Sequence, residues 1–128
     1  MTPRPRLAAA ALAACTAAAC FSEHSPSGPS DSLTCERAAE PPGPDSAFVV
    51  VSGFAFAPAE LRVAAGTRVV WINCEPAGTP GHTTTADGGE WDSPTLSPGD
   101  VFPDVPAAGD HPYFCRVHPF MQARVIAE

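Results

Sequence analysis

Three side chains that can bind a soft metal ion lie within seven residues near the C-terminus. Cys115, His118 and Met121 follow one another with the spacing C-x2-H-x2-M, and His82 lies thirty-three residues before Cys115. Thiolate and thioether sulfur suit Cu(I), whereas imidazole suits both Cu(I) and Cu(II). The four side chains together predict a mononuclear copper site with two histidines, one cysteine and a weak axial methionine.

Each of these residues alone also has an ordinary structural interpretation. A single cysteine is often a buried thiol or half of a disulfide, and a single methionine usually packs in a core. Zinc is the rival metal, but it prefers four strong ligands and does not ordinarily recruit a thioether. A binuclear copper centre would need a second cysteine in the loop, and the residues between Cys115 and Met121 include none. The order and spacing of the four candidate ligands, taken together, therefore favour a site for one copper ion.

Short strands must position these ligands. Runs rich in β-branched and aromatic residues alternate with Gly, Pro, Asp and Asn, a pattern that predicts strands and turns. The candidate strands are 48–51, 61–63, 67–73, 82–85, 95–97, 100–102, 111–115 and 124–127. No stretch after residue 20 keeps a 3.6-residue apolar period. We therefore expect an all-β, antiparallel Greek-key sandwich or barrel of about seven to eight strands, with the two ligand loops at one end.

Two positions refine this expectation. Pro103 interrupts the strand that begins at Val101, which predicts an edge strand or a shorter one. Asn73 ends the strongest strand candidate, and we expect its side chain to help fix the ligand loops by hydrogen bonds.

The N-terminal third differs in composition from the rest. Residues 1–20 have a short basic start and an Ala-rich apolar run that is too short to span a membrane, which predicts an export signal. Residues 21–46 are rich in Pro and Ser and contain few large apolar side chains, which predicts a tether. Residues 47–128 are then the folded domain.

The five cysteines suggest a lipid anchor and a disulfide. Small residues before a cysteine resemble the lipobox of bacterial lipoproteins, in which that cysteine is acylated. Cys15 has the better matching residues but implies a very short leader; Cys20 gives a leader of ordinary length. We favour Cys20 and keep Cys15 as the alternative, because acylation at Cys20 and metal binding at Cys115 leave Cys35 and Cys74 as an even pair. We expect these two to form a disulfide, with two free thiols as the alternative.

The charge excludes one class of partner. The chain has seven Lys and Arg residues against fourteen Asp and Glu residues, a net charge of −7. It lacks the basic stripe that displaces counterions from phosphate, so nucleic acid is not an expected partner. An acidic surface fits a soluble protein and favours a basic patch on any protein partner.

Residues 47–128 resemble a cupredoxin of the plastocyanin and amicyanin group. The resemblance rests on Phe54-Ala55-Phe56-Ala57-Pro58, Gly66-Thr67, Val70-Trp71-Ile72-Asn73, Pro80-Gly81-His82-Thr83 and Tyr113-Phe114-Cys115-Arg116-Val117-His118-Pro119-Phe120-Met121. It implies that the four candidate ligands bind one copper ion that cycles between Cu(I) and Cu(II). It also implies that His118 lies nearest the solvent and serves, with Pro119 and Phe120, as an electron port. Two departures are Ala123, where the family usually has Gly, and His111, where it often has an aromatic residue.

The resulting hypothesis is an exported one-electron carrier rather than an enzyme. Copper capture or delivery outside the cytoplasm is the alternative, and a sandwich domain of a larger assembly with incidental metal is a third. Delivery proteins tend to offer several exposed Met or His residues, whereas this chain has two Met in total, one of them the initiator. We expect a monomer that exchanges electrons with redox proteins. It would be lipid-anchored to a bacterial membrane or periplasmic.

Overall fold

The computed structural model describes residues 35, 36, 38 and 44–128. The predicted export signal, both candidate acylation sites and most of the predicted tether lie outside the described residues. Cys35 lies within them and forms a disulfide with Cys74. Among the described residues, no helix combines the length and apolar character needed to cross a membrane.

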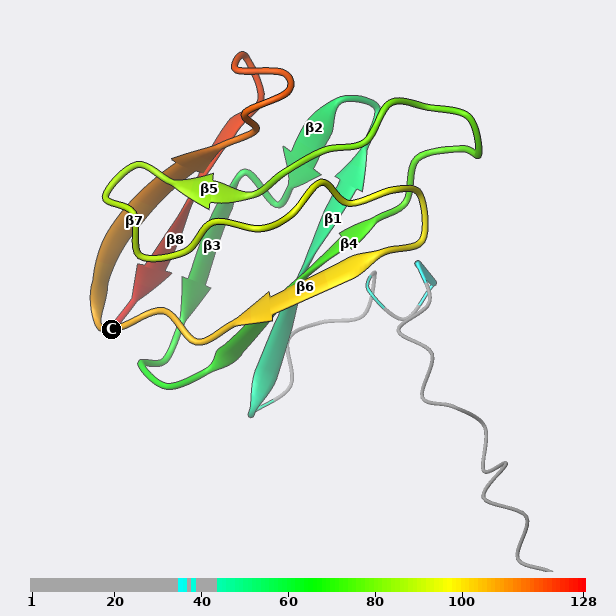
Figure 1. The fold of residues 1–128 in the computed structure, drawn as a ribbon. Coiled ribbons are helices and arrows are strands. Elements are labelled where there is room, and N and C mark those ends of the chain that lie inside the picture. Colours follow the sequence, from blue (N-terminus) through cyan, green and yellow to red (C-terminus); the bar gives the residue numbers. More distant parts are fainter. Residues whose placement is uncertain (1–34, 37, 39–43) are drawn as a thin grey trace, which may run out of the picture. The chain divides into compact units, whose positions relative to one another are not determined.

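Eight strands form two four-stranded sheets (Figure 1). The first sheet has the order β2-β1-β4-β6 and consists of β1 (Ser46–Ser52), β2 (Ala55–Ala57), β4 (Arg68–Asn73) and β6 (Val101–Asp104). The second has the order β3-β8-β7-β5 and consists of β3 (Glu60–Val63), β5 (Thr85–Ala86), β7 (Gly109–Phe114) and β8 (Gln122–Ala127). This arrangement confirms the predicted all-β sandwich.

The pairing is mixed rather than wholly antiparallel. β1 pairs with β4 in parallel, and β3 pairs with β8 in parallel, whereas the other four pairs are antiparallel. The expectation of an antiparallel sandwich was wrong for these two pairs. After β2 the chain crosses to the second sheet to form β3, and it then returns to run beside β1 in the same direction.

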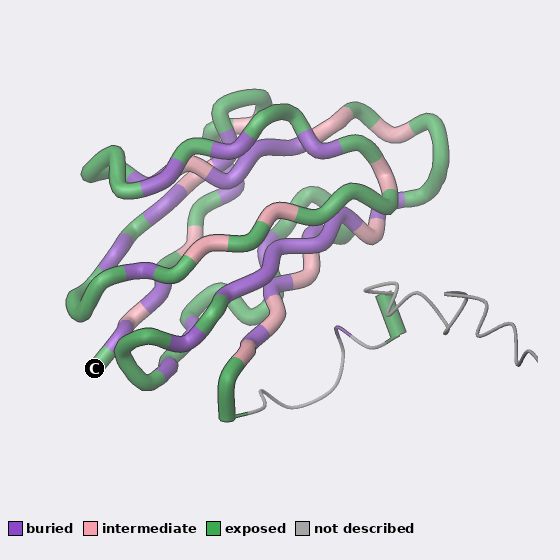
Figure 2. The backbone as a smooth tube through the Cα atoms, turned by 60° about the horizontal axis from the view of Figure 1, so that its bottom comes forward, coloured by how far each residue is buried: buried purple, intermediate pink, exposed green. Residues whose placement is uncertain are grey.

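The core lies between the sheets and is built around aromatic rings. Inward residues of β1 alternate with more exposed ones, and buried residues recur along the strands (purple in Figure 2). The Trp71 ring is fully buried and lies 5.2 Å from the Trp91 ring and 5.6 Å from the Tyr113 ring, between centroids. His111 is also buried and packs on Trp91, at 5.8 Å between centroids. These rings give both sheets a rigid common support.

Two expected strands, 82–85 and 95–97, are much shorter in the described structure than the sequence predicts. Segments 82–85 and 95–97 contribute only a bridge between His82 and Leu96, a bridge between Thr85 and Asp92, and the short strand β5. Pro94 and Pro98 flank the second segment and cannot donate backbone hydrogen bonds, so a longer ladder does not form. Conversely, the structure adds β2, which the sequence patterns did not indicate.

Pro103 and Ala123 both lie within strands of the structure. β6 contains Pro103 and is an edge strand of the first sheet, as expected. Ala123 lies within β8 opposite Tyr113, in regular antiparallel pairing. The departure from glycine at this position therefore leaves the strand intact.

Candidate metal centre

Three potential metal donors converge at one end of the sandwich. The Sγ atom of Cys115 lies 3.9 Å from the Nδ1 atom of His82 and 3.9 Å from the Nδ1 atom of His118. The two Nδ1 atoms are 3.2 Å apart. A point equidistant from the three atoms lies about 2.1 Å from each, close to the roughly 2.0–2.3 Å of zinc–nitrogen and zinc–sulfur bonds. The triangle therefore has the right size for one transition-metal ion.

The C-terminal loop that carries three of the candidates is closed by its own backbone. Cys115 directly follows β7, and its N–H donates to the carbonyl of Met121 at 3.0 Å. The N–H of Met121 donates to the carbonyl of His118 at 2.9 Å. Met121 is 2% exposed, belongs to the core cluster and directly precedes β8. The end of β7 and the beginning of β8 therefore fix the two ends of the loop.

His82 comes from a second loop, between β4 and β5, and is fully buried. Its backbone exchanges two hydrogen bonds with Leu96, at 3.0 and 2.7 Å. The side chain of Asn73 donates to the same Leu96 carbonyl at 2.8 Å and accepts from the N–H of Glu75 at 3.0 Å. The expected role of Asn73 in fixing this loop is confirmed.

Glu75 supports His82 from outside the donor triangle. Its Oε1 atom lies 3.2 Å from Nε2 of His82, and both side chains are buried. With Nδ1 directed at the other donors, the Nε2–H donates to the carboxylate, an arrangement that orients a metal-binding imidazole. Glu75 also accepts from the N–H of Phe54 at 2.8 Å, and this bond is the main cause of its lowered pKa. Burial lowers the pKa of His82, which favours the neutral, metal-binding form.

Thr83 joins the two ligand loops. Its N–H donates to the Cys115 sulfur at 3.3 Å, and its Oγ1 accepts from the N–H of Arg116 at 2.8 Å. Hydrogen bonds to a ligating cysteine sulfur are among the features that tune the potential of a blue-copper site. The sequence patterns assigned no role to Thr83, Glu75 or Phe54. The position of Thr83 directly after His82 was the one available signal.

The exposure of the donors is uneven. Cys115 and His82 are fully buried, whereas His118 is partly exposed. Apolar side chains with substantial exposure lie beside it in sequence: Val117 at 46% and Phe120 at 71%. The Phe54 ring lies 5.0 Å from the His118 ring and 5.4 Å from the His82 ring, between centroids. His118 is thus the donor through which the centre reaches solvent.

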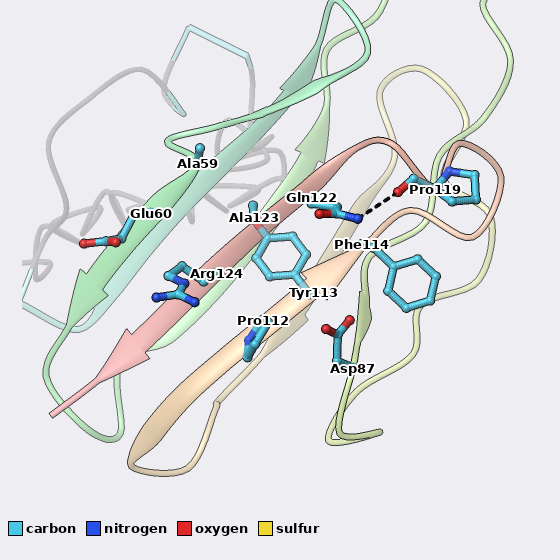
Figure 3. Close-up of a pocket in the computed structure, with 10 residues that line it drawn as sticks. All are labelled: Ala59, Glu60, Asp87, Pro112, Tyr113, Phe114, Pro119, Gln122, Ala123 and Arg124. Carbon is cyan, nitrogen blue, oxygen red and sulfur yellow. Dashed lines mark hydrogen bonds between the residues drawn. The ribbon is translucent and has the colours of Figure 1, made fainter.

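An open groove of about 550 Å³ lies over the strands of the second sheet (Figure 3). Its lining comes mainly from β3, β7, β8 and the segment around Asp87, and it contains none of the four candidate ligands. Pro119 reaches it from the ligand loop and accepts a hydrogen bond from the side chain of Gln122 at 3.3 Å. The candidate chemistry therefore lies at the end of the sandwich and not in this groove.

No protein-family model matches the chain. The chain is 31% identical over 86 residues to amicyanin-alpha of Methylorubrum extorquens, covering 65% of this chain and 72% of that protein. The crystal structure of amicyanin from Paracoccus versutus superposes with a TM-score of 0.56 at 28% identity, covering 71% of this chain and 88% of that chain.

A purple cupredoxin from Nitrosopumilus maritimus has a TM-score of 0.55 at 23% identity, covering 63% of this chain and 98% of that chain, and supports the fold alone. The donor set of His82, Cys115, His118 and Met121 is consistent with one type 1 copper ion. With this site, this sandwich and this level of identity, the chain belongs to the cupredoxins and is amicyanin-like.

Proposed function

We propose that the protein is an exported one-electron carrier in which His82, Cys115, His118 and Met121 bind one copper ion. The observation that carries this proposal is the triangle of three donors, of which His82 and Cys115 are buried and His118 is partly exposed, and which has the size of a metal site. A copper ion bound there supplies a Cu(I)/Cu(II) couple. A protein frame fixed by backbone hydrogen bonds favours similar ligand positions in both oxidation states.

Four protein ligands also favour a carrier over an enzyme. Catalytic metal sites usually keep a coordination position for water or substrate. Here the three donors of the triangle and the axial candidate Met121 come from the protein, and the Phe54 ring packs against both imidazoles. The site is thus suited to exchanging electrons rather than binding a substrate.

His118, Pro119 and Phe120 are proposed as the electron port. His118 is the partly exposed donor, and its neighbours Pro119 and Phe120 are exposed apolar residues. An apolar surface around a partly exposed ligand lets a partner protein approach the metal closely and exclude water. The proposed partners are redox proteins, and the acidic composition favours partners with a basic patch.

Location outside the cytoplasm is supported by the disulfide. The Cys35–Cys74 bridge belongs to an oxidising compartment, where such bonds persist. Export through residues 1–20 and acylation at Cys20, with Cys15 as the alternative, complete the proposal of a monomer anchored to a bacterial membrane or free in the periplasm. Mass spectrometry of the mature N-terminus tests it, and an unmodified terminus cut at neither cysteine would contradict the lipid anchor.

The copper proposal is tested by loading the protein with Cu(II) and recording its visible absorption and its voltammogram. We expect an intense thiolate-to-copper band and reversible reduction. Cys115→Ser should abolish the band, and Met121→Leu should keep it while shifting the potential. A wild-type protein without the band would overturn the blue-copper assignment. A band without reversible reduction would favour copper capture or delivery instead.

A further inference from the structure

The turn between β1 and β2 has a residue that its backbone geometry disfavours. Ser52 pairs with Ala55, so Gly53 and Phe54 form a two-residue turn, with φ values of 60° and 57°. Two positive φ angles characterise a type I′ turn, whose second position usually holds glycine. Among the described residues, Phe54 is the one non-glycine residue with a positive φ. Turn geometry alone therefore does not explain a phenylalanine here.

A backbone hydrogen bond and two ring contacts connect Phe54 to the donor triangle and to Glu75, which supports it. Its N–H donates to Oε1 of Glu75 at 2.8 Å, and the same oxygen lies 3.2 Å from Nε2 of His82. Its ring meets the His82 ring edge-on, at 5.4 Å and 85°, and the His118 ring edge-on, at 5.0 Å and 89°. One strained residue thus contacts both imidazoles. Strained backbone conformations persist at functional sites where neighbouring contacts hold them.

His118 depends on such contacts more than His82 does. The buried ring of His82 has a carboxylate partner in Glu75. Within the described part of the chain, the side chains that lie within hydrogen-bonding distance of the His118 ring are those of the other two donors, His82 and Cys115. Phe120 lies 6.0 Å from the His118 ring but is itself 71% exposed. Phe54, which is 38% exposed and fixed through its backbone, is the better-held neighbour.

We propose that Phe54 is a positioning residue of the metal centre, which the strained turn presents so that its ring fixes the orientation of the His118 imidazole. The assignment of His118 as a copper ligand rests on the proposed function. The packing of Phe54 on His118 does not, because it is a contact between two side chains of this chain. A fixed imidazole needs little rearrangement when copper binds or changes oxidation state.

The test compares Phe54→Gly, which suits the turn but removes the ring, with Phe54→Tyr, which keeps both ring and strain. Val105→Gly is the control, because it removes a 55% exposed apolar side chain from the loop after β6. The first readout is the NMR line width of the His118 ring signals in the copper-free protein. The second is the rate at which a chelator removes Cu(I) from the loaded protein.

We expect Phe54→Gly to broaden the His118 signals and to speed copper loss about tenfold or more, the size of effect typical of residues that orient metal ligands. Phe54→Tyr and Val105→Gly should both behave as the wild type. Sharp His118 signals and a wild-type release rate in Phe54→Gly would overturn the proposal, whatever its melting temperature.

If Phe54→Gly does not fold, Phe54→Leu decides between the same two outcomes, because it keeps a large apolar side chain without an aromatic ring. Failure of the proposed function is distinguishable from failure of this inference. A wild-type protein that binds no copper contradicts the proposed function. The His118 line widths of the copper-free variants still test the positioning role of Phe54.

Discussion

The carboxylate of Glu75 lies 3.2 Å from Nε2 of His82, and the two side chains are 4% and 0% exposed. The same carboxylate oxygen accepts the N–H of Phe54. Glu75 therefore orients a candidate ligand and fixes a turn at the same time, although it is not itself a donor of the triangle. Glu75 also places a negatively charged carboxylate in direct contact with the His82 ring.

Replacing Glu75 by Gln should raise the reduction potential. Gln keeps an acceptor oxygen but removes a buried negative charge that favours the more positive Cu(II) state. We expect an increase on the order of 60 mV, a tenfold change in the equilibrium constant of a one-electron couple. Voltammetry checks it, with Glu60→Gln as the control because Glu60 is about half exposed and its charge is screened by solvent. An equal shift in both variants would contradict a specific role for Glu75.

Replacing Thr83 by Val should destabilise the protein while keeping its colour. The valine cannot accept the hydrogen bond from the N–H of Arg116, and a polar group left without its partner is destabilising by about 1–3 kcal/mol. The N–H of residue 83 still donates to the Cys115 sulfur, so the absorption band should remain. Denaturant unfolding measures the loss. Thr83→Ser keeps the hydroxyl and should be close to the wild type; a Thr83→Val variant as stable as the wild type would contradict the role of this hydrogen bond.

The parts of the site that sequence analysis predicted are those encoded over short distances. The spacing from Cys115 to Met121 is local, and the loop closes on itself through backbone hydrogen bonds. The strand around Trp71 was predictable because its β-branched and aromatic residues suit a buried strand. His82 was found because an imidazole is a rare and chemically distinctive side chain.

The supporting residues were not predictable because they reach the site through distant contacts. Phe54 and Glu75 are 21 residues apart in sequence, and Thr83 and Cys115 are 32 apart. A Glu or Thr in a loop carries no local sign that it will be buried against a ligand. The strand β2 was missed because its turn is Gly53-Phe54, without the Asn-Gly or Asp-Gly signal of a type I′ turn.

Removing the Cys35–Cys74 disulfide should lower the free energy of unfolding. The bridge spans a sequence separation of 39, which corresponds to about 3–4 kcal/mol on the chain-entropy model. A Cys35→Ser, Cys74→Ser double variant, compared with the wild type by denaturant unfolding, measures this difference. Thiol titration of the unfolded, copper-free mature protein acylated at Cys20 should find one free thiol, from Cys115. Three free thiols would show that the bridge does not form in the protein.

The copper-free protein should lose stability on acidification. Burial lowers the pKa of His82 below its usual value of 6.5, so the unfolded chain takes up this proton more readily than the folded one. The free energy of unfolding should therefore fall as the pH drops through about 6.5. The lowered pKa of Glu75 adds a second loss below about 4.5, because the folded state resists protonation of that carboxylate.

Melting temperatures of the copper-free protein between about pH 4 and pH 8 check both parts. Glu75→Gln should lack the loss at lower pH. It should keep the loss near pH 6.5, since Glu75 raises the pKa of His82 and its removal lowers that pKa further. Bound copper should move the upper transition to lower pH, because the metal competes with the proton for the imidazole. Stability that rises between pH 7 and pH 5 in the copper-free protein would contradict the buried, neutral state of His82.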